Sequence, residues 1–210
     1  FKKKTQNLKL IKGDIRNLNQ VVKASKGCDC IIHLAYLNGT QFFYSHPDLV
    51  LDIGVKGMIN VIEASKLNKI KKFILASSSE VYQTPPIIPT PEEVPLIVPN
   101  LKNPRYSYGA GKIISEVLAI NNADLFKKMI IFRPHNVYGP NMGLEHVIPQ
   151  LIIKANKEKL KNKKYVNLKI IGDGNDSRAF NYIDDFTDGI IKVIFKGKHK
   201  EVYNIGSNEK

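Results

Sequence analysis

The chain has 210 residues, a formal net charge of +13, 43 % hydrophobic residues and 24 % charged residues. These proportions are ordinary for a globular protein, and the length suits one sizeable α/β domain. No apolar run approaches the roughly 20 residues that a membrane-spanning helix needs, so we expect no membrane segment. The charge suggests nucleic-acid binding, but only four of the 32 basic residues are arginine, and the lysines are scattered. The composition therefore argues against nucleic acid and favours a solvated basic surface.

Both ends of the sequence, and its cysteines, bear on where the protein works. The chain begins at Phe1 with no initiator Met or apolar signal segment, and it stops just after a strand-like segment. We therefore expect a piece of a longer, cytoplasmic protein. Cys28 and Cys30 have no second cysteine pair with which to hold zinc, so we interpret them as reduced packing residues and predict no metal site.

Short apolar segments alternate with helical patterns along the chain. We expect strands at residues 8–11, 30–35, 73–76, 129–132, 168–171 and 202–205, and helices at 17–25, 50–67, 106–122, 146–156 and 184–195. A proline-rich loop occupies residues 85–99. This alternation predicts an α/β fold with a doubly wound parallel sheet, covered by helices on both faces. Ligands of such sheets bind at the carboxyl ends of the strands.

The strongest chemical signal is Ser78 together with Tyr108 and Lys112. Tyr108 and Lys112 are four residues apart on a predicted helix, so they project from the same face. A nearby ammonium favours the phenolate form of tyrosine, which can then take a proton from a hydroxyl group. Ser78 follows a predicted strand and can hydrogen-bond the same oxygen. The order of strand, serine run, loop and helix makes this spacing more specific than the short motif is alone.

With these residues, the sequence resembles the extended short-chain dehydrogenase/reductase family of NAD-dependent nucleotide-sugar epimerases, dehydratases and decarboxylases. The resemblance covers nearly the whole chain. It is carried by Gly13-Asp-Ile-Arg16, Ile32-His-Leu-Ala35, Ala76-Ser-Ser-Ser-Glu-Val-Tyr82, Tyr108 with Lys112, Arg133-Pro-His-Asn-Val-Tyr-Gly-Pro140, Gly172-Asp-Gly174 with Arg178, and Tyr203-Asn-Ile-Gly206.

The resemblance implies a role for each matching residue. It implies a catalytic set of Ser78, Tyr108 and Lys112, with Glu80 as a further acid/base group. NAD contacts are implied for Asp14, Ile15, Leu34, Ala35, Tyr36, Ala76, Ser77, Tyr108, Lys112 and Pro134. Contacts with the nucleotide-sugar substrate are implied for Ser78, Asn136, Val147 and Arg178. We interpret His33 as a packed strand histidine, and weigh a solvated surface charge against a diphosphate ligand for Arg178.

The resemblance also implies an organisation. We expect residues 1–134 to form an incomplete NAD-binding Rossmann domain that lacks its first strands. Residues 135–210 would be mainly substrate-binding, with segments at about 168–205 returning to the sheet. A homodimer is implied, formed through the helices at 50–67 and 106–122.

Several departures from the family pattern limit these expectations. The glycine-rich phosphate loop is absent, and so is the residue that separates NAD from NADP, so that choice stays open. Gly54 stands where the family usually has Asn, Gln83 where it has Gly, and His146 where it has Asn.

The reaction depends on the residues that follow Ser78. Dehydratases of the family carry Asp where this chain has Ser79, which disfavours dehydration. Decarboxylases carry Thr-Ser-Glu, close to residues 78–80, although other segments do not match them. We therefore favour an epimerase that acts through a transient 4-keto sugar, with a uronate decarboxylase or a 4,6-dehydratase as the alternative. A non-catalytic nucleotide- or RNA-binding protein is a further alternative, against which the intact catalytic set argues.

Overall fold

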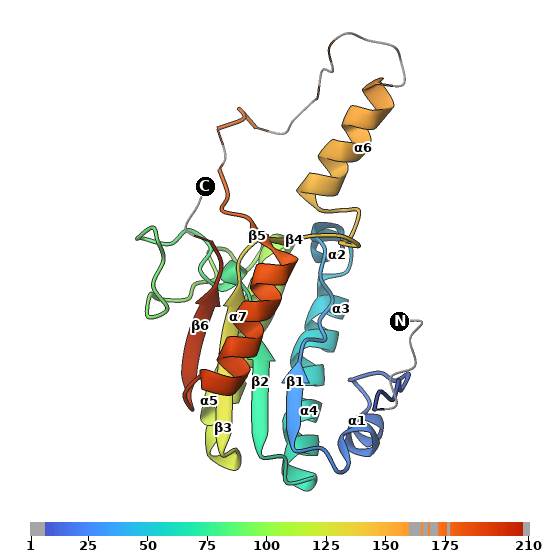
Figure 1. The fold of residues 1–210 in the computed structure, drawn as a ribbon, viewed down its shortest axis with the longest axis vertical. Coiled ribbons are helices and arrows are strands. Elements are labelled where there is room, and N and C mark those ends of the chain that lie inside the picture. Colours follow the sequence, from blue (N-terminus) through green and yellow to red (C-terminus); the bar gives the residue numbers. More distant parts are fainter. Residues whose placement is uncertain (1–6, 160–164, 166–167, 169–171, 176, 208–210) are drawn as a thin grey trace.

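A parallel four-stranded sheet forms the centre of the protein. The computed structural model describes residues 7–207 apart from 160–164, 166–167, 169–171 and 176. The strands are β1 (Cys30–His33), β2 (Lys72–Ala76), β3 (Lys128–Pro134) and β6 (Glu201–Ile205), in the order β1-β2-β3-β6. All neighbouring strands run parallel, with Ile32 opposite Ile74 and Ile74 opposite Ile130. Their carboxyl ends therefore meet at one edge (Figure 1).

The connections between the strands are helical. The helices are α1 (Leu18–Ser25), α2 (Thr40–Ser45), α3 (Pro47–Leu51), α4 (Gly57–Leu67), α5 (Ser107–Asn121), α6 (Val147–Lys159) and α7 (Ile183–Lys196). Short 3-10 turns occur at η2 (Ser79–Val81), η3 (Pro104–Tyr106) and η4 (Ala123–Leu125). A π-helical turn, η1 (Asp52–Lys56), joins α3 to α4.

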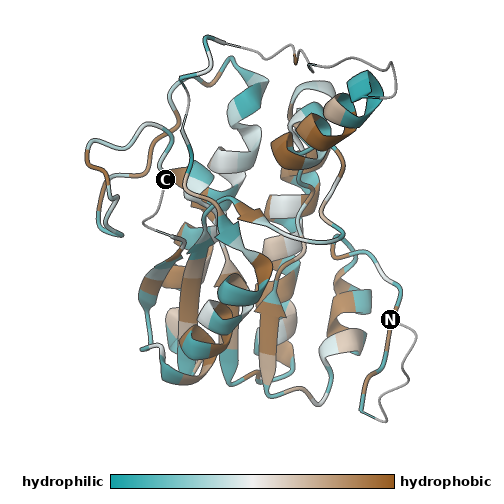
Figure 2. Ribbon diagram, turned by 45° about the horizontal axis from the view of Figure 1, so that its top comes forward, coloured by the Kyte–Doolittle hydropathy of each residue, from teal (hydrophilic) through white to brown (hydrophobic). Residues whose placement is uncertain are grey.

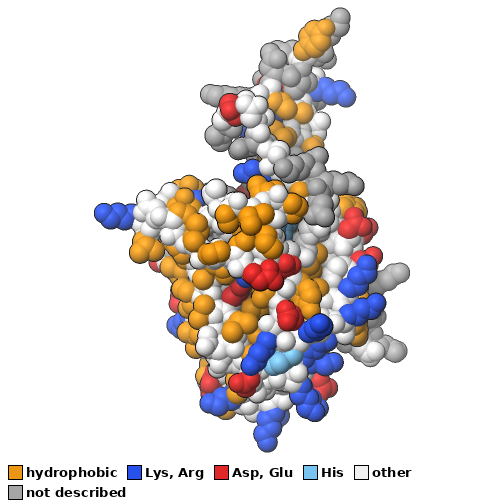
Figure 3. Space-filling view, turned by 90° about the vertical axis from the view of Figure 1, so that its left-hand side faces the viewer, with side chains coloured by type: hydrophobic (Ala, Val, Ile, Leu, Met, Phe, Trp, Pro, Cys, Tyr) orange, Lys and Arg blue, Asp and Glu red, His pale blue; other side chains and the backbone are white. Residues whose placement is uncertain are grey.

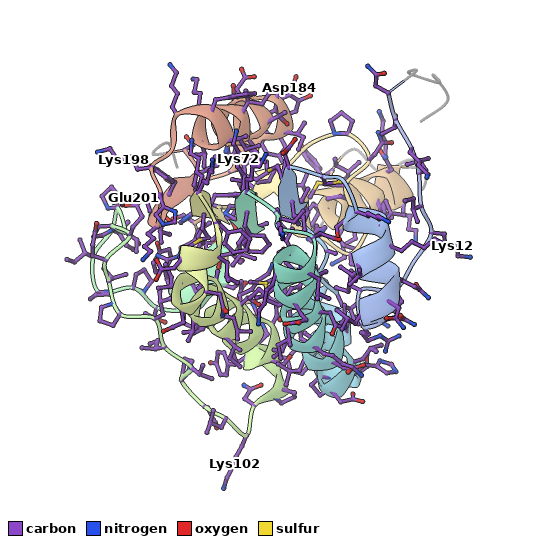
Figure 4. The ribbon with its side chains drawn as sticks, turned by 90° about the horizontal axis from the view of Figure 1, so that it is seen from below. Lys12, Lys72, Lys102, Asp184, Lys198 and Glu201 are labelled. Atoms are coloured by element: carbon purple, nitrogen blue, oxygen red, sulfur yellow. The ribbon has the colours of Figure 1, made fainter. Side chains whose placement is uncertain are left out.

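The two faces of the sheet bury different helices because strand residues alternate in direction. Phe73 and Leu75 of β2 pack in one core with Met58 and Ile62 of α4 and the end of α5. The alternate residues Ile74 and Ala76 pack in a second core with Val193 and other residues of α7. Viewed along the sheet, α7 lies on one side and α4 and α5 on the other (Figure 4). The predicted doubly wound α/β class is therefore confirmed.

Most predicted elements are present. The predicted helices at 17–25, 106–122, 146–156 and 184–195 are present, and the helix predicted at 50–67 is divided into α3 and α4 by the π-helical turn η1. Of the five predicted strands that the described residues test, four are present and one is wrong. Residues 8–11 form no strand, and Leu8, Leu10 and Ile11 are exposed. A strand requires a hydrogen-bonded neighbour, and no described strand pairs with the outer edge of β1. Residues 169–171 of the predicted strand at 168–171 lie outside the described residues.

A second layer of short elements lies beyond the carboxyl ends of the strands. The pattern did not predict the two-residue strands β4 (Val137–Tyr138) and β5 (Asn181–Tyr182), which pair in parallel. It also missed α2, whose six residues are too few for a helical period to be recognised. These elements and α6 stand above the sheet in Figure 1, on the side where strands of this architecture collect ligands.

Apart from Lys112, Glu116 and Arg133, the lysine, arginine, aspartate and glutamate residues that the structure describes are at least partly exposed. Figure 2 shows largely hydrophobic strands covered by helices that carry both hydrophobic and hydrophilic residues. On the face in Figure 3, basic side chains are interspersed with acidic ones toward the lower end, rather than gathered in one purely basic patch. Lys12, Lys102 and Lys198 point away from the body in Figure 4. In the described residues, no helix combines the length and the apolar character required to cross a membrane.

Candidate functional site

One cavity of about 490 Å³ opens at the carboxyl ends of β1, β2 and β3. Residues from β2, α5, α2, α7 and the segments after β1 and β3 line it together. The lining residues are Leu34, Tyr36, Asn38, Gly39, Thr40, Phe43, Ala76, Ser77, Ser78, Ser79, Glu80, Tyr108, Lys112, Phe132, Pro134, Asn136, Val137, His146, Phe186 and Ile190. The cavity thus collects residues that are far apart in the sequence, as expected for a ligand site at this edge.

Tyr108 lies in the first turn of α5, with its ring held between two other aromatic rings. The Phe43 ring stacks on it at a centroid distance of 4.9 Å, and the Tyr36 ring meets it edge-on at 5.1 Å. Burial raises the pKa of Tyr108 to about 12, while a hydrogen bond with Ser78 acts in the opposite direction. Ser78 also accepts a hydrogen bond from the backbone N–H of Glu80 at 3.2 Å. Ser78 and Tyr108 are thereby held beside each other in the lining of the cavity.

Lys112 is almost fully buried one helical turn after Tyr108. Its Nζ donates to the backbone oxygen of Ala76 at 2.6 Å and lies 4.2 Å from the centroid of the Tyr36 ring. The same Nζ lies 5.6 Å from the centroid of the Tyr108 ring. Burial lowers the pKa of Lys112 to about 7, and the charge of Glu116 opposes that change. Lys112 can therefore gain or lose a proton near neutral pH.

Glu80 lines the same cavity from η2. Its Oε1 accepts a hydrogen bond from Nη2 of Arg105 at 2.9 Å, and the two groups form a partly exposed ion pair. The Arg105 guanidinium also lies over the Phe43 ring, 5.4 Å from its centroid. Glu80 is therefore tied to a neighbouring cation, and that cation also packs on Phe43, the ring that stacks on Tyr108.

A buried ion pair supports the cavity from below. Glu116, four residues after Lys112 on α5, accepts hydrogen bonds from Arg133 of β3 at 2.9 and 2.6 Å and one from the Ser77 hydroxyl. Arg133 and Glu116 have side chains only 4 % and 6 % exposed, so neither charge is stabilised by bulk water. The pair fixes α5 to β3 and to the segment that carries Ser78.

The same network extends to the proline-rich loop and β6. Arg133 Nη1 donates to the Tyr82 hydroxyl at 2.5 Å and to the Glu92 carbonyl at 2.9 Å. Tyr82 in turn donates to Asn204, whose backbone N–H donates to Glu92. Hydrogen bonds beneath the cavity thus connect the end of β2, the proline-rich loop, α5, β3 and β6.

The structure brings together ten of the residues that the resemblance implied. The cavity lining contains Leu34, Tyr36, Ala76, Ser77, Ser78, Glu80, Tyr108, Lys112, Pro134 and Asn136. It does not contain Ala35, nor Val147, which is exposed at the start of α6. Arg178 is also outside this lining, and its Nη1 donates to the carbonyl of Ser177. Their implied contacts remain predictions.

Asp14 and Ile15 lie apart from this cavity. Both line a separate groove beside α1. The Asp14 carboxylate accepts hydrogen bonds from Arg16, which lower its pKa to about 2, and Arg16 also pairs with Asp52. Ile15 lies directly against Gly57, the first residue of α4. Within the described residues, both side chains contribute to packing and turn structure, and their implied NAD contacts remain predictions.

Sequence reasoning missed several residues around the site. Phe43 comes from the unpredicted α2, and Phe186 and Ile190 come from α7, to which the sequence assigned no site residue. Glu116 had a recognisable signal, because it continues the four-residue spacing of Tyr108 and Lys112. His33 fulfils the packing interpretation, since it is buried and stacks on Phe73, and burial lowers its pKa to about 4.

Comparison with known proteins shows the family of this chain. Residues 1–206 match the model of the NAD dependent epimerase/dehydratase family. The chain therefore belongs to that family. A dTDP-D-glucose 4,6-dehydratase of Dictyostelium discoideum is 31 % identical over 98 % of this chain and 48 % of its own length. A UDP-glucuronate 4-epimerase of Thermodesulfobacterium geofontis is 30 % identical over 99 % of this chain and 61 % of its own.

Solved structures agree with this assignment. A dTDP-glucose 4,6-dehydratase from Streptomyces venezuelae, solved with NAD bound, matches with a TM-score of 0.77 and 25 % identity, over 92 % of this chain and 56 % of that one. An epimerase from Methanothermobacter thermautotrophicus has the same fold, with a TM-score of 0.80, 24 % identity and coverage of 98 % and 60 %. The chain thus spans 48 to 61 % of the length of these proteins.

The residues present fit one half of an NAD molecule. The buried Lys112 ammonium donates to the Ala76 carbonyl and lines the cavity together with the hydroxyls of Ser77, Ser78 and Ser79. Such donors suit the nicotinamide ribose. The glycine-rich loop that would hold the pyrophosphate is not in the sequence. The fit is therefore to the nicotinamide side of the cofactor.

The buried ion pair generates a stability prediction. Glu116→Gln leaves the Arg133 guanidinium buried without a counter-charge, which typically costs about 3–5 kcal/mol. We expect a lowered midpoint of chemical unfolding in the complete protein. Asp29→Asn, which breaks the exposed Lys71–Asp29 pair, is the control and should leave the midpoint almost unchanged. Equal effects of the two changes would show that Glu116 does not hold the site together.

Proposed function

We propose that the complete protein is an NAD-dependent nucleotide-sugar epimerase that acts through a transient 4-keto sugar. One observation carries the proposal: Ser78, Tyr108 and Lys112 meet in a cavity at the carboxyl ends of the strands, with Tyr108 enclosed by aromatic rings. Enclosure away from water strengthens the interaction between an ammonium and a phenolate, so the pair can exchange a proton with a sugar hydroxyl.

In this proposal Tyr108 is the acid/base group. Its oxygen takes the proton of the C4 hydroxyl and later returns one to the 4-keto oxygen. Lys112 stabilises the phenolate by its charge, and Ser78 orients the reacting oxygen by hydrogen bonding. NAD, held on its nicotinamide side by Lys112 and the serine segment, would supply reversible hydride transfer at C4 and would be unchanged after each cycle. The 4-keto sugar would have to turn over in the cavity between the two transfers for C4 to be inverted.

Two features favour epimerisation over elimination. Ser79, the residue after Ser78, offers no carboxyl group to protonate a leaving hydroxyl. Glu80, the one acidic residue of the cavity lining as described, is paired with Arg105. The Arg105 guanidinium thus already engages one oxygen of that carboxylate. Glu80 is therefore proposed to shape the site rather than to drive elimination.

The rest of the chain would serve binding and assembly. We propose that residues 135–210 mainly bind the nucleotide sugar, through Asn136, Val147 and the Arg178 guanidinium, which suits a diphosphate. A homodimer is proposed through the outer faces of α4 and α5. Those faces carry exposed apolar side chains, namely Ile59, Leu67, Ile114, Val117 and Ile120. The proposed compartment is the cytoplasm.

Replacing Tyr108 tests the mechanism. Tyr108→Phe keeps the ring and its stacking but removes the acid/base oxygen, so turnover of a nucleotide sugar should fall by about 10²–10⁴. Tyr44→Phe, at an exposed tyrosine of α2, should leave turnover unchanged. Product formation by the complete protein is measured with UDP-, dTDP-, GDP- and CDP-sugars. Near-normal turnover in Tyr108→Phe would remove Tyr108 from the mechanism.

Replacing Glu80 separates the reactions. If the enzyme is an epimerase, Glu80→Gln should lower turnover only modestly, and no carbon dioxide should form from any substrate. Glu93→Gln, at an exposed glutamate in the proline-rich loop, is the control. Nuclear magnetic resonance (NMR) spectra of the product and a carbon dioxide assay read the outcome. Carbon dioxide released from a nucleotide-linked uronic acid by the unaltered protein would replace epimerisation with decarboxylation.

A further inference from the structure

Tyr36 occupies an unusual position beside the catalytic residues. It follows β1, and its ring reaches between two helical segments that each present a glycine. A Cβ atom built on Gly54 of η1 would overlap the end of the Tyr36 ring and its hydroxyl, and one built on Gly111 of α5 would overlap the hydroxyl. The Tyr36 hydroxyl is buried and has no hydrogen-bond partner among the described residues.

The two glycines explain how the ring fits. Neither has a backbone angle that requires glycine, because both lie in helical segments without a positive φ. Alanine is a better helix former than glycine, so helix propensity would favour a side chain at both positions. The space that the Tyr36 side chain occupies therefore explains why residues 54 and 111 have no side chain. The π-helical turn that contains Gly54 is of a kind often found at functional sites.

The ring contacts the proton-transfer pair with both its face and its edge. Its face lies 4.2 Å from Lys112 Nζ, and its edge meets the Tyr108 ring. An ammonium over an aromatic face is attracted by the negative potential of the ring, most strongly where water is excluded. The Ala76 carbonyl holds the same ammonium from the sheet side.

Other charged or titratable groups face Lys112 from each neighbouring element. Glu116, on α5, is already bonded to Arg133 and Ser77. His33, on β1, is neutral near pH 7 because its pKa is about 4. Tyr108 is neutral there as well, because its pKa is raised. The Tyr36 ring and the Ala76 carbonyl are thus the groups in direct contact that favour the ammonium form.

We propose that Tyr36 is a positioning residue for Lys112. We also propose that residues 54 and 111 are glycine because a larger side chain at either position would overlap Tyr36. The aromatic face holds the ammonium against the Ala76 carbonyl and beside Tyr108. The size match between the tyrosine and the two glycines fixes the ring in that place. The catalytic part of this inference rests on the proposed function, whereas the size match does not.

A stability cycle tests the size match without any activity. Gly111→Ala should lower the unfolding midpoint, because the added methyl group meets the Tyr36 hydroxyl. Tyr36→Phe should rescue Gly111→Ala, since the next atoms are then Cζ at 3.3 Å and Leu51 Cδ2 at 3.4 Å. Tyr36→Phe should not rescue Gly54→Ala, which also overlaps the ring carbons, but Tyr36→Leu should. Additive effects in both pairs would overturn the size match.

The titration of Lys112 tests positioning. In protein labelled with ¹³C at the lysine Cε, the signal that Lys112→Met removes belongs to Lys112. In Tyr36→Leu, the apparent pKa of Lys112 should fall by about 0.4–1.5, the range expected for loss of a cation–π contact. In Tyr36→Phe, which keeps the ring, it should stay as in the unaltered protein. An unchanged pKa in the folded Tyr36→Leu variant would overturn the proposal.

The pH dependence of turnover then connects the two levels. When both residues are protonated, the pair of Tyr108 and Lys112 loses its first proton near pH 7. In the proposed active form the pair keeps one proton, which is on Lys112, and Tyr108 is a phenolate. Lowering the Lys112 pKa should therefore move the rise in kcat/KM to lower pH and reduce the plateau by the same factor, about 3- to 30-fold. If the NMR shift occurs without this change in rate, Tyr36 positions Lys112 but the proposed mechanism is wrong. If neither occurs, the positioning role is wrong.

Discussion

The buried ammonium of Lys112 is the constraint on which the rest of the site depends. A lysine charge that has left water must be compensated locally, and here the carbonyl at the end of β2 and the ring of Tyr36 do so. Burial lowers the pKa of Lys112 to about 7, so this group changes its protonation state near neutral pH. Tyr108 is held one helical turn away, between aromatic rings.

The buried charges below the cavity extend this arrangement through the fold. Glu116 is one turn further along α5, and its pairing with Arg133 ties that helix to β3. Ser77 donates to the same carboxylate, so the serine segment at the end of β2 is fixed in relation to α5. A buried ion pair of this kind gives little net stability, yet breaking it is costly. It therefore favours one arrangement of helix, strand and serine segment over alternatives.

Much of this could be predicted from the sequence, for identifiable reasons. The strands at 73–76 and 129–132 are short, apolar and bounded, and the helix at 106–122 has a clear period, so tertiary packing agrees with the local signal. Ten implied site residues line one cavity because parallel strands bring their carboxyl ends to one edge. The strand at 8–11 was wrong because alternation alone supplies no hydrogen-bonded neighbour.

What the sequence could not predict depends on contacts between distant segments. Gly54 stood out only as a departure from the family pattern, and its reason is the ring of Tyr36, which comes from another element. The stacking of Phe43 on Tyr108 depends on α2, which is too short to have a period. Arg105 pairs with Glu80 across 25 residues, and nothing in the spacing indicates it.

The most direct test of reversible oxidation at C4 follows the hydrogen on that carbon. The complete protein is incubated with nucleotide sugars that carry deuterium at C4, and the product is examined by NMR and mass spectrometry. We expect the deuterium to remain on C4 of a product with inverted C4 configuration, because the hydride removed from C4 is returned to the same carbon without exchange with water. Exchange of the label with water, or its appearance on another carbon, would contradict reversible oxidation at C4.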